Sequence, residues 1–134
     1  MRRTKARGKI NWQDATDIKD RINHLVKHAS IDWVKIKNIY TFRSVNANTR
    51  AYARIWGLGR VWQQALNLEP SYIIEVISEK FDHLPQREKD EILLHEIAHI
   101  PKNFSGSLMP HKRRGKGNFH DKLKSLITQY KKGI

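Results

Sequence analysis

One short run of residues constrains the fold of this chain more than any other feature. Ile92 to Ile100 reads Ile-Leu-Leu-His-Glu-Ile-Ala-His-Ile. Pro85 suits the first turn of a helix and Pro101 stops one, so we expect a helix over about 85–100. Apolar side chains would cover nearly the whole circumference of this helix, which predicts that it is central and buried.

Three polar side chains interrupt this apolar surface, namely His95, Glu96 and His99. Buried polar groups need partners, and the spacing of these three residues indicates that the partner is a metal ion. His95 and His99 are four residues apart, so both imidazoles can reach one tetrahedral ion, and Glu96 lies beside them as a potential proton acceptor. This is the HExxH motif of zinc metallopeptidases. A structural alternative, in which the histidines bond to a buried carboxylate such as Glu75 or Glu79, explains the burial but not the spacing.

The third ligand of a catalytic zinc site can be narrowed by elimination, because such sites usually have three protein ligands. Asp121 is the only side-chain carboxylate after Glu96, which excludes a downstream Glu ligand of the thermolysin kind. The elongated metzincin motif needs Gly and His at the positions that Lys102 and Ser105 occupy here, so that class is excluded as well.

Three candidates for the third ligand remain, His111, His120 and Asp121. Segment 101–110 is rich in turn-forming residues and can fold back under the motif helix. We therefore expect His111, which follows this segment directly, to be the third ligand. His120 is the second choice.

The rest of the chain is predicted to form helices and short strands. An amphipathic helix is expected first, then three or four short strands, the motif helix and a final amphipathic helix that begins near His120. This order predicts an α+β fold. The expected elements are a helix over about 15–30, strands over 34–42, 51–56 and 72–77, and a segment over 61–66 that fits either a strand or a short helix.

Composition excludes several classes of protein. The absence of Cys rules out disulfide frameworks, thiolate zinc sites and cysteine nucleophiles. No apolar run reaches the roughly 18 residues that a membrane span requires. We expect one cytoplasmic domain over 13–134, preceded by a basic tail over 1–12.

The net charge of +13 is concentrated at the two ends of the chain. Residues 14–100 are neutral overall, whereas 1–13 and 101–134 carry all of the excess, part of it in Lys112-Arg113-Arg114-Gly115-Lys116-Gly117. Basic patches favour polyanions such as nucleic acid. An alternative function is therefore a nucleic-acid-binding protein with a structural or vestigial zinc site, or a peptidase that acts on DNA-bound proteins, as SprT-like zincins do.

Several segments of the chain together carry a likeness to a known family. These segments are Ala53–Leu58, Tyr72–Glu79, Phe81-Asp82, His95–Pro101, Phe104-Ser105-Gly106 and Pro110-His111. They resemble a family of small predicted zinc metallopeptidases of archaea and phages, over about residues 40–130 and most specifically in the helix and loop around the motif. The resemblance implies a minimal zincin fold, with a small, mostly antiparallel sheet of three to four strands on the HExxH helix, zinc (Zn2+) bound by His95, His99 and His111, and Glu96 as catalytic base.

A metallopeptidase would also need a path for a peptide or protein substrate and a donor for the developing oxyanion. An extended substrate can pair with an edge strand, and we expect 72–78 to be that strand. The sequence does not choose among the candidate donors. These are Tyr40, Tyr52, Tyr72, Tyr130 and Arg43.

Overall fold

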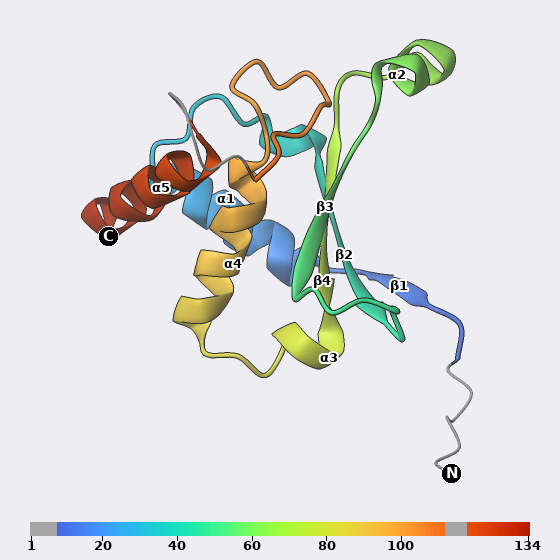
Figure 1. Ribbon diagram of the computed structural model, residues 1–134, viewed down its shortest axis with the longest axis horizontal. Coiled ribbons are helices and arrows are strands. Elements are labelled where there is room, and N and C mark those ends of the chain that lie inside the picture. Colours follow the sequence, from blue (N-terminus) through green and yellow to red (C-terminus); the bar gives the residue numbers. More distant parts are fainter. Residues whose placement is uncertain (1–7, 112–117) are drawn as a thin grey trace.

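A computed structural model describes residues 8–111 and 118–134. This part of the chain contains both strands and helices (Figure 1). In chain order the elements are β1 (Asn11–Asp14), α1 (Thr16–His28), a 3-10 turn (Ile36–Asn38), β2 (Ile39–Val45), β3 (Ala53–Gly57), α2 (Arg60–Leu66), β4 (Tyr72–Ile77), α3 (Ser78–Phe81), α4 (Gln86–Ala98) and α5 (Phe119–Gly133).

The four strands form one sheet in the order β1-β2-β4-β3. β2 and β4 are parallel, whereas the pairs β1-β2 and β3-β4 are antiparallel. Helices α1, α4 and α5 lie on one side of the sheet, and α2 stands beyond its end (Figure 1). This arrangement confirms the predicted α+β fold, with a small, mostly antiparallel sheet on the motif helix and further helices from both ends of the chain.

The core lies between the sheet and the three long helices. Apolar residues at helical spacing bury one face of α1, whereas α4 buries residues on several sides, as expected for a central helix. From α1 the core takes Ile18, Ile22 and Leu25, and from α4 it takes Leu93, Leu94, Ile97 and Ala98. Ile39, Ile74 and Val76 close it from the sheet, and Leu126 closes it from α5.

The strand order overturns the prediction that 72–78 is an edge strand. β4 pairs with β2 through Ile39 and Tyr72 and with β3 through Ala53 and Val76, so it is an interior strand. Both of its edges are already hydrogen-bonded and cannot accept a substrate. β3 is the strand at this edge of the sheet, and its other side pairs with no strand in the described ranges.

Three short elements differ from the sequence prediction, and one ambiguous segment is resolved. The strand expected over 34–42 begins only at Ile39, because Asn38 N–H donates to the Lys35 carbonyl at 2.9 Å and closes a turn. The ambiguous segment over 61–66 is helical and forms α2. The short helix α3 directly follows β4 and was not predicted. β1 was not predicted either, because all four of its residues are exposed and carry no apolar alternation.

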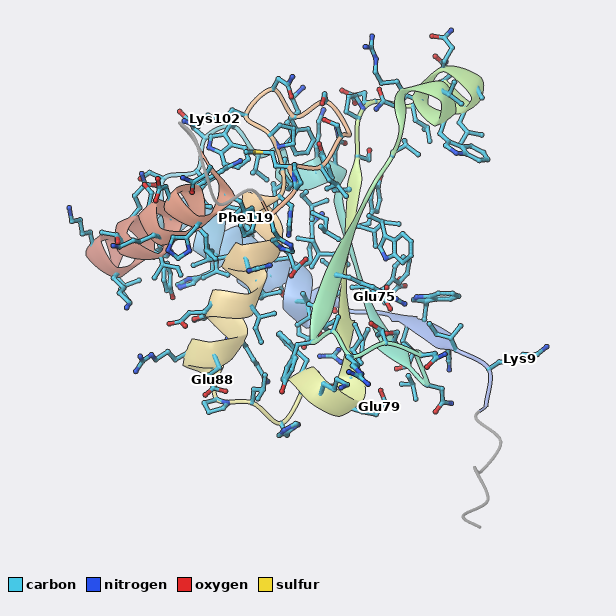
Figure 2. All side chains as sticks on the ribbon, in the orientation of Figure 1. Lys9, Glu75, Glu79, Glu88, Lys102 and Phe119 are labelled. Atoms are coloured by element: carbon cyan, nitrogen blue, oxygen red, sulfur yellow. The ribbon has the colours of Figure 1, made fainter. Side chains whose placement is uncertain are left out.

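The face of the sheet away from the helices contains a buried charge. Glu75 is fully buried (0% exposed) and accepts hydrogen bonds from Arg54 Nε at 2.8 Å and from Trp56 Nε1 at 2.9 Å (Figure 2). Burial opposes ionisation of Glu75, but these donors hold its pKa below the usual value. Glu75 therefore stabilises the β3-β4 pair and is not a partner of the motif histidines. Glu79 accepts a hydrogen bond from the Asn46 backbone instead.

Among the helices of the described residues, none combines the length and the apolar character that crossing a bilayer requires.

Candidate metal centre

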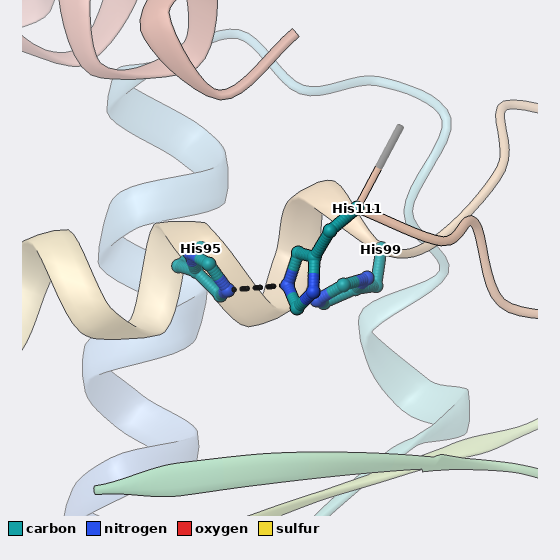
Figure 3. Close-up of side chains that lie close together, drawn as sticks. All are labelled: His95, His99 and His111. Carbon is teal, nitrogen blue, oxygen red and sulfur yellow. Dashed lines mark hydrogen bonds between the residues drawn. The ribbon is translucent and has the colours of Figure 1, made fainter. Parts of the chain in front are cut away.

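Three of the predicted site residues meet at one point of the fold. His95 and His99 project from the end of α4, and the chain folds back so that His111 faces both of them (Figure 3). Each histidine offers one ring nitrogen, and these atoms all lie within 4.8 Å of one another. His95 Nε2 and His111 Nε2 are 3.0 Å apart. Nitrogens bound to one tetrahedral zinc are about 3.3 Å apart, so small side-chain movements would bring this set onto one ion.

The orientation of His99 is set by the loop that follows α4. Its Nδ1 lies 2.6 Å from the Met109 carbonyl oxygen, which can only accept, so Nδ1 carries the proton and Nε2 keeps its lone pair. Met109 N–H in turn donates to the His99 carbonyl at 2.7 Å. This reciprocal contact folds the loop back and leaves His111 only two residues further along the chain.

The surroundings of His95 and His99 favour their neutral forms. Burial, followed by repulsion from His99 and His111, lowers the pKa of His95 to about 4. Burial also lowers the pKa of His99, although the bond to Met109 opposes that shift. A metal ion binds only the neutral imidazole, so these two side chains are in the form that binds metal at neutral pH.

Glu96 is the most desolvated acid near the cluster. The residue is 7% exposed, and its carboxylate has no hydrogen bond or ion pair with any residue in the described part of the chain. Burial raises its pKa to about 8. A buried group of this kind is a candidate for proton transfer, because structural carboxylates are normally paired.

Glu96 lines a groove with a volume of about 620 Å³, which we call the α4–β3 groove. The groove lies between the start of β3 and the facing sides of α4 and α5. Its lining residues are Tyr52, Ala53, Leu84, Glu88, Glu91, Ile92, His95, Glu96, Leu123 and Ile127.

The comparisons with known proteins identify the family. A family model described as "Putative phage metallopeptidase" matches residues 10–126, which is most of the chain. The chain belongs to this phage metallopeptidase family. No curated protein and no solved structure matches it. Membership of a metallopeptidase family implies a metal and a peptide or protein substrate, in agreement with the histidine cluster.

Phe119, the first residue of α5, forms an apolar wall beside the histidine cluster in this member of the phage metallopeptidase family (Figure 2). Its ring stacks on His99, with centroids 4.4 Å apart, and meets the rings of His95 and His111 edge-on at 4.9 and 4.8 Å. Phe119 is 5% exposed, so it excludes water from one side of the cluster and restricts the rings. Sequence reasoning could not find this position, because Phe119 also fits the apolar stripe of α5.

Tyr72 anchors the loop that carries His111. The Tyr72 hydroxyl donates to the Ser107 carbonyl and accepts from Gly106 N–H, both at 2.8 Å, and the residue is 1% exposed. Gly106 has φ +96, and a Cβ on it would lie 2.3 Å from the Leu58 carbonyl oxygen. Only glycine fits this position without strain. These contacts fasten the loop to the sheet before it returns to α4.

Lys122 of α5 forms a second anchor for the returning loop. Its Nζ donates to the Ile100 carbonyl at 2.5 Å, lies 3.2 Å from Met109 Sδ and sits 4.5 Å from the centre of the Trp33 ring. Burial and the nearby Lys102 lower its pKa to about 8. Lys122 thus ties α5 to the end of the motif helix.

His120, the second choice for the third ligand, lies outside the histidine cluster. It lines a neighbouring hollow of about 630 Å³ together with His95, His111 and Asp121. The structure therefore brings His111 to the motif pair and leaves His120 and Asp121 at the border of the site.

The five candidate oxyanion donors lie in different parts of the structure. Tyr52 is the one that lines the α4–β3 groove beside Glu96. The other four occupy positions elsewhere. Tyr40 lines a hollow on the far side of β4, Tyr72 bonds to the loop, Tyr130 contacts Arg21 and His24, and Arg43 pairs with Asp17 and Asp82.

Proposed function

We propose that this chain is a zinc-dependent peptidase in which His95, His99 and His111 hold the metal and Glu96 is the general base. The observation that best supports this is the convergence of three imidazoles beside a buried carboxylate that has no partner among the residues the structure describes. Imidazole nitrogens suit zinc, and three protein ligands leave a fourth position for water or substrate.

Bound zinc would supply Lewis acidity, which lowers the pKa of a water ligand toward neutrality and polarises a carbonyl group. The protein supplies the proton transfers. Glu96 accepts a proton from the attacking water and passes it to the leaving amine. Desolvation makes its carboxylate a stronger base than an exposed one, and the apolar wall at Phe119 limits competing solvent.

The proposed substrate path runs along the edge of β3 that pairs with no strand among the described residues, where an extended peptide can add as a further strand. Ala53, the first residue of β3, lines the same groove as Glu96, so a peptide on this edge runs past the base. Tyr52 adjoins this edge and is exposed over 47% of its surface, which allows its hydroxyl to reach a developing oxyanion.

Zinc stoichiometry is the first test of the metal site. Elemental analysis of untagged native protein should give about one zinc per chain. His111→Ala should lose this zinc, whereas the matched variant His120→Ala should retain it, because only His111 lies in the cluster. The absence of zinc in the native protein, even after reconstitution near neutral pH, would contradict the proposed function.

Peptide cleavage by the zinc-loaded chain tests the catalytic roles. Glu96→Gln should abolish cleavage and retain zinc, because the amide cannot accept the proton. Tyr52→Phe should lower kcat by about 10²- to 10³-fold with zinc retained, the usual effect of losing one oxyanion donor. Full activity of Tyr52→Phe would show that Tyr52 is not the oxyanion donor, and it would not affect the role proposed for Glu96 as base.

Nucleic-acid binding remains the second candidate function, and it rests on the sequence alone. The net charge of +13 supports it, while the segment 112–117 and residues 1–7 lie outside the described residues. Binding to DNA should weaken steeply as salt rises, whereas weak, salt-independent binding would remove both this function and action on DNA-bound proteins.

A further inference from the structure

The α4–β3 groove has an acidic rim in an otherwise basic protein. Glu88 and Glu91 lie on the same side of α4 as His95, about two turns and about one turn before it. Apolar side chains of Ile92, Leu123 and Ile127 lie in the same groove. The groove therefore combines an apolar wall with two carboxylates, although the chain has 26 basic residues against 13 acidic ones.

The rim carboxylates are available to a ligand. The side chain of Glu88, in the first turn of α4 (Figure 2), has no hydrogen bond or ion pair with the residues the structure describes. Glu91 approaches only Arg87, at 3.7 Å, and the Arg87 side chain is 84% exposed, so this pair is a weak surface contact. By contrast Asp90, on another side of the same helix, is held by Arg21 at 2.7 Å.

A second feature independently marks this groove as the place where a ligand binds. Glu96, which is 7% exposed and whose carboxylate has no partner in the described ranges, lines this groove. A ligand that occupies the groove therefore lies beside the group that we propose as the base. The rim acids lie on the path of that ligand.

We propose that the groove selects peptides with a Lys or Arg two or three residues from the bond that is cleaved. Helix rise places Glu91 about 6 Å and Glu88 about 10 Å from His95 along the axis, and an extended peptide advances about 3.3 Å per residue. The aliphatic stem of the basic side chain packs on Ile92 and its neighbours, and its cation meets the two carboxylates. This inference rests on the proposed function, because it names the substrate class of the same site.

The test compares three matched peptides that carry Lys, Gln or Glu at the second and third positions on either side of one bond. Equilibrium binding is measured by fluorescence anisotropy in a zinc-loaded Glu96→Gln background, which prevents turnover. Cleavage by the zinc-loaded native chain is measured separately, with a denatured protein as a general substrate. The acids are removed with the double variant Glu88→Gln, Glu91→Gln. Glu69→Gln, an exposed acid outside the groove, controls for net charge.

We expect the Lys peptide to bind roughly three- to tenfold more tightly than the Gln peptide, with the Glu peptide weakest. The double variant should lose this preference, and Glu69→Gln should keep it. The preference should also shrink as salt rises, because the carboxylates are solvent-exposed. A lower melting temperature without any change in selectivity would mean that Glu88 only complements the dipole of α4.

The outcomes separate this inference from the proposed function. Equal binding of the three peptides, binding of none of them, or a Lys preference that survives the double variant would overturn the inference. Cleavage of the general substrate would then still support the peptidase function. Conversely, selective binding of the Lys peptide without cleavage of any substrate would refute the peptidase function and leave the specificity of the groove in place.

Discussion

Replacement of Tyr72 by Phe removes one hydroxyl and keeps the ring, so it tests how the returning loop is held. The hydroxyl is buried and makes two hydrogen bonds of 2.8 Å, from Gly106 N–H and to the Ser107 carbonyl. A buried backbone group left without a partner costs about 1–3 kcal/mol. We expect the free energy of unfolding of Tyr72→Phe to fall by about this amount.

The same loss should appear in metal affinity, because the anchored loop leads to His111. If a loss of about 3 kcal/mol were expressed entirely in the closure of this loop, the zinc dissociation constant would rise by roughly 150-fold. Gln63 and Met109 still hold other points of the loop, through bonds of 2.9 Å to the Ser105 carbonyl and 2.7 Å to the His99 carbonyl. We therefore expect about a tenfold weaker zinc affinity.

Tyr130→Phe is the matched control. The Tyr130 hydroxyl is also hydrogen-bonded, to Arg21 and His24 of α1, each at 3.2 Å, and to Asp90 of α4, and none of these partners belongs to the loop. Competition with a calibrated zinc chelator measures affinity, and urea unfolding measures stability. If Tyr72→Phe loses stability but binds zinc as tightly as Tyr130→Phe, the loop does not position His111 in the way argued above.

Three further predictions concern the loop, the sheet and the base. Gly106→Ala should weaken zinc binding, measured by chelator competition, because the new Cβ would clash with the Leu58 carbonyl. Arg54→Met should lower the free energy of unfolding in urea by about 3–5 kcal/mol, because it leaves buried Glu75 without its counter-charge, and the double variant with Glu75→Gln should recover part of the loss. The pKa of Glu96 is raised to about 8 in the metal-free protein, so its contribution to stability is present below about 4.5 and lost as pH rises through 8. Metal-free Glu96→Gln should therefore be more stable than the native chain by a few kcal/mol at pH 9 but not at pH 4, and equal differences at both pH values would contradict this.

Much of the fold could be predicted from local pattern. The apolar spacing of α1, the β-branched run of β4 and the nearly all-apolar α4 each indicated the correct element, because helix and strand periodicity follow from backbone geometry within a few residues. β1 could not be found in this way. It is exposed along its whole length and is held by pairing with β2, a contact between Asn11 and Val45 at its first register position.

The order of the strands also lay outside what local pattern can reveal. β4 looks like an edge strand if only its place in the chain, just before the motif helix, is considered. The pairing of Ile39 with Tyr72 places it inside the sheet and leaves β3 at the edge. Strand order depends on which distant segments pair, and similar β-branched runs do not distinguish these pairings.

The sequence by itself determined the arrangement of His95, Glu96 and His99, because one helix sets the positions of residues four apart through its own hydrogen bonds. It could also reduce the third ligand to a few candidates. Only the tertiary structure decided that His111 rather than His120 approaches the pair and that Tyr52 shares the groove with Glu96. These positions depend on contacts between distant segments, such as Tyr72 with Gly106 and Phe119 with the histidines, and such contacts leave no periodic trace in the chain.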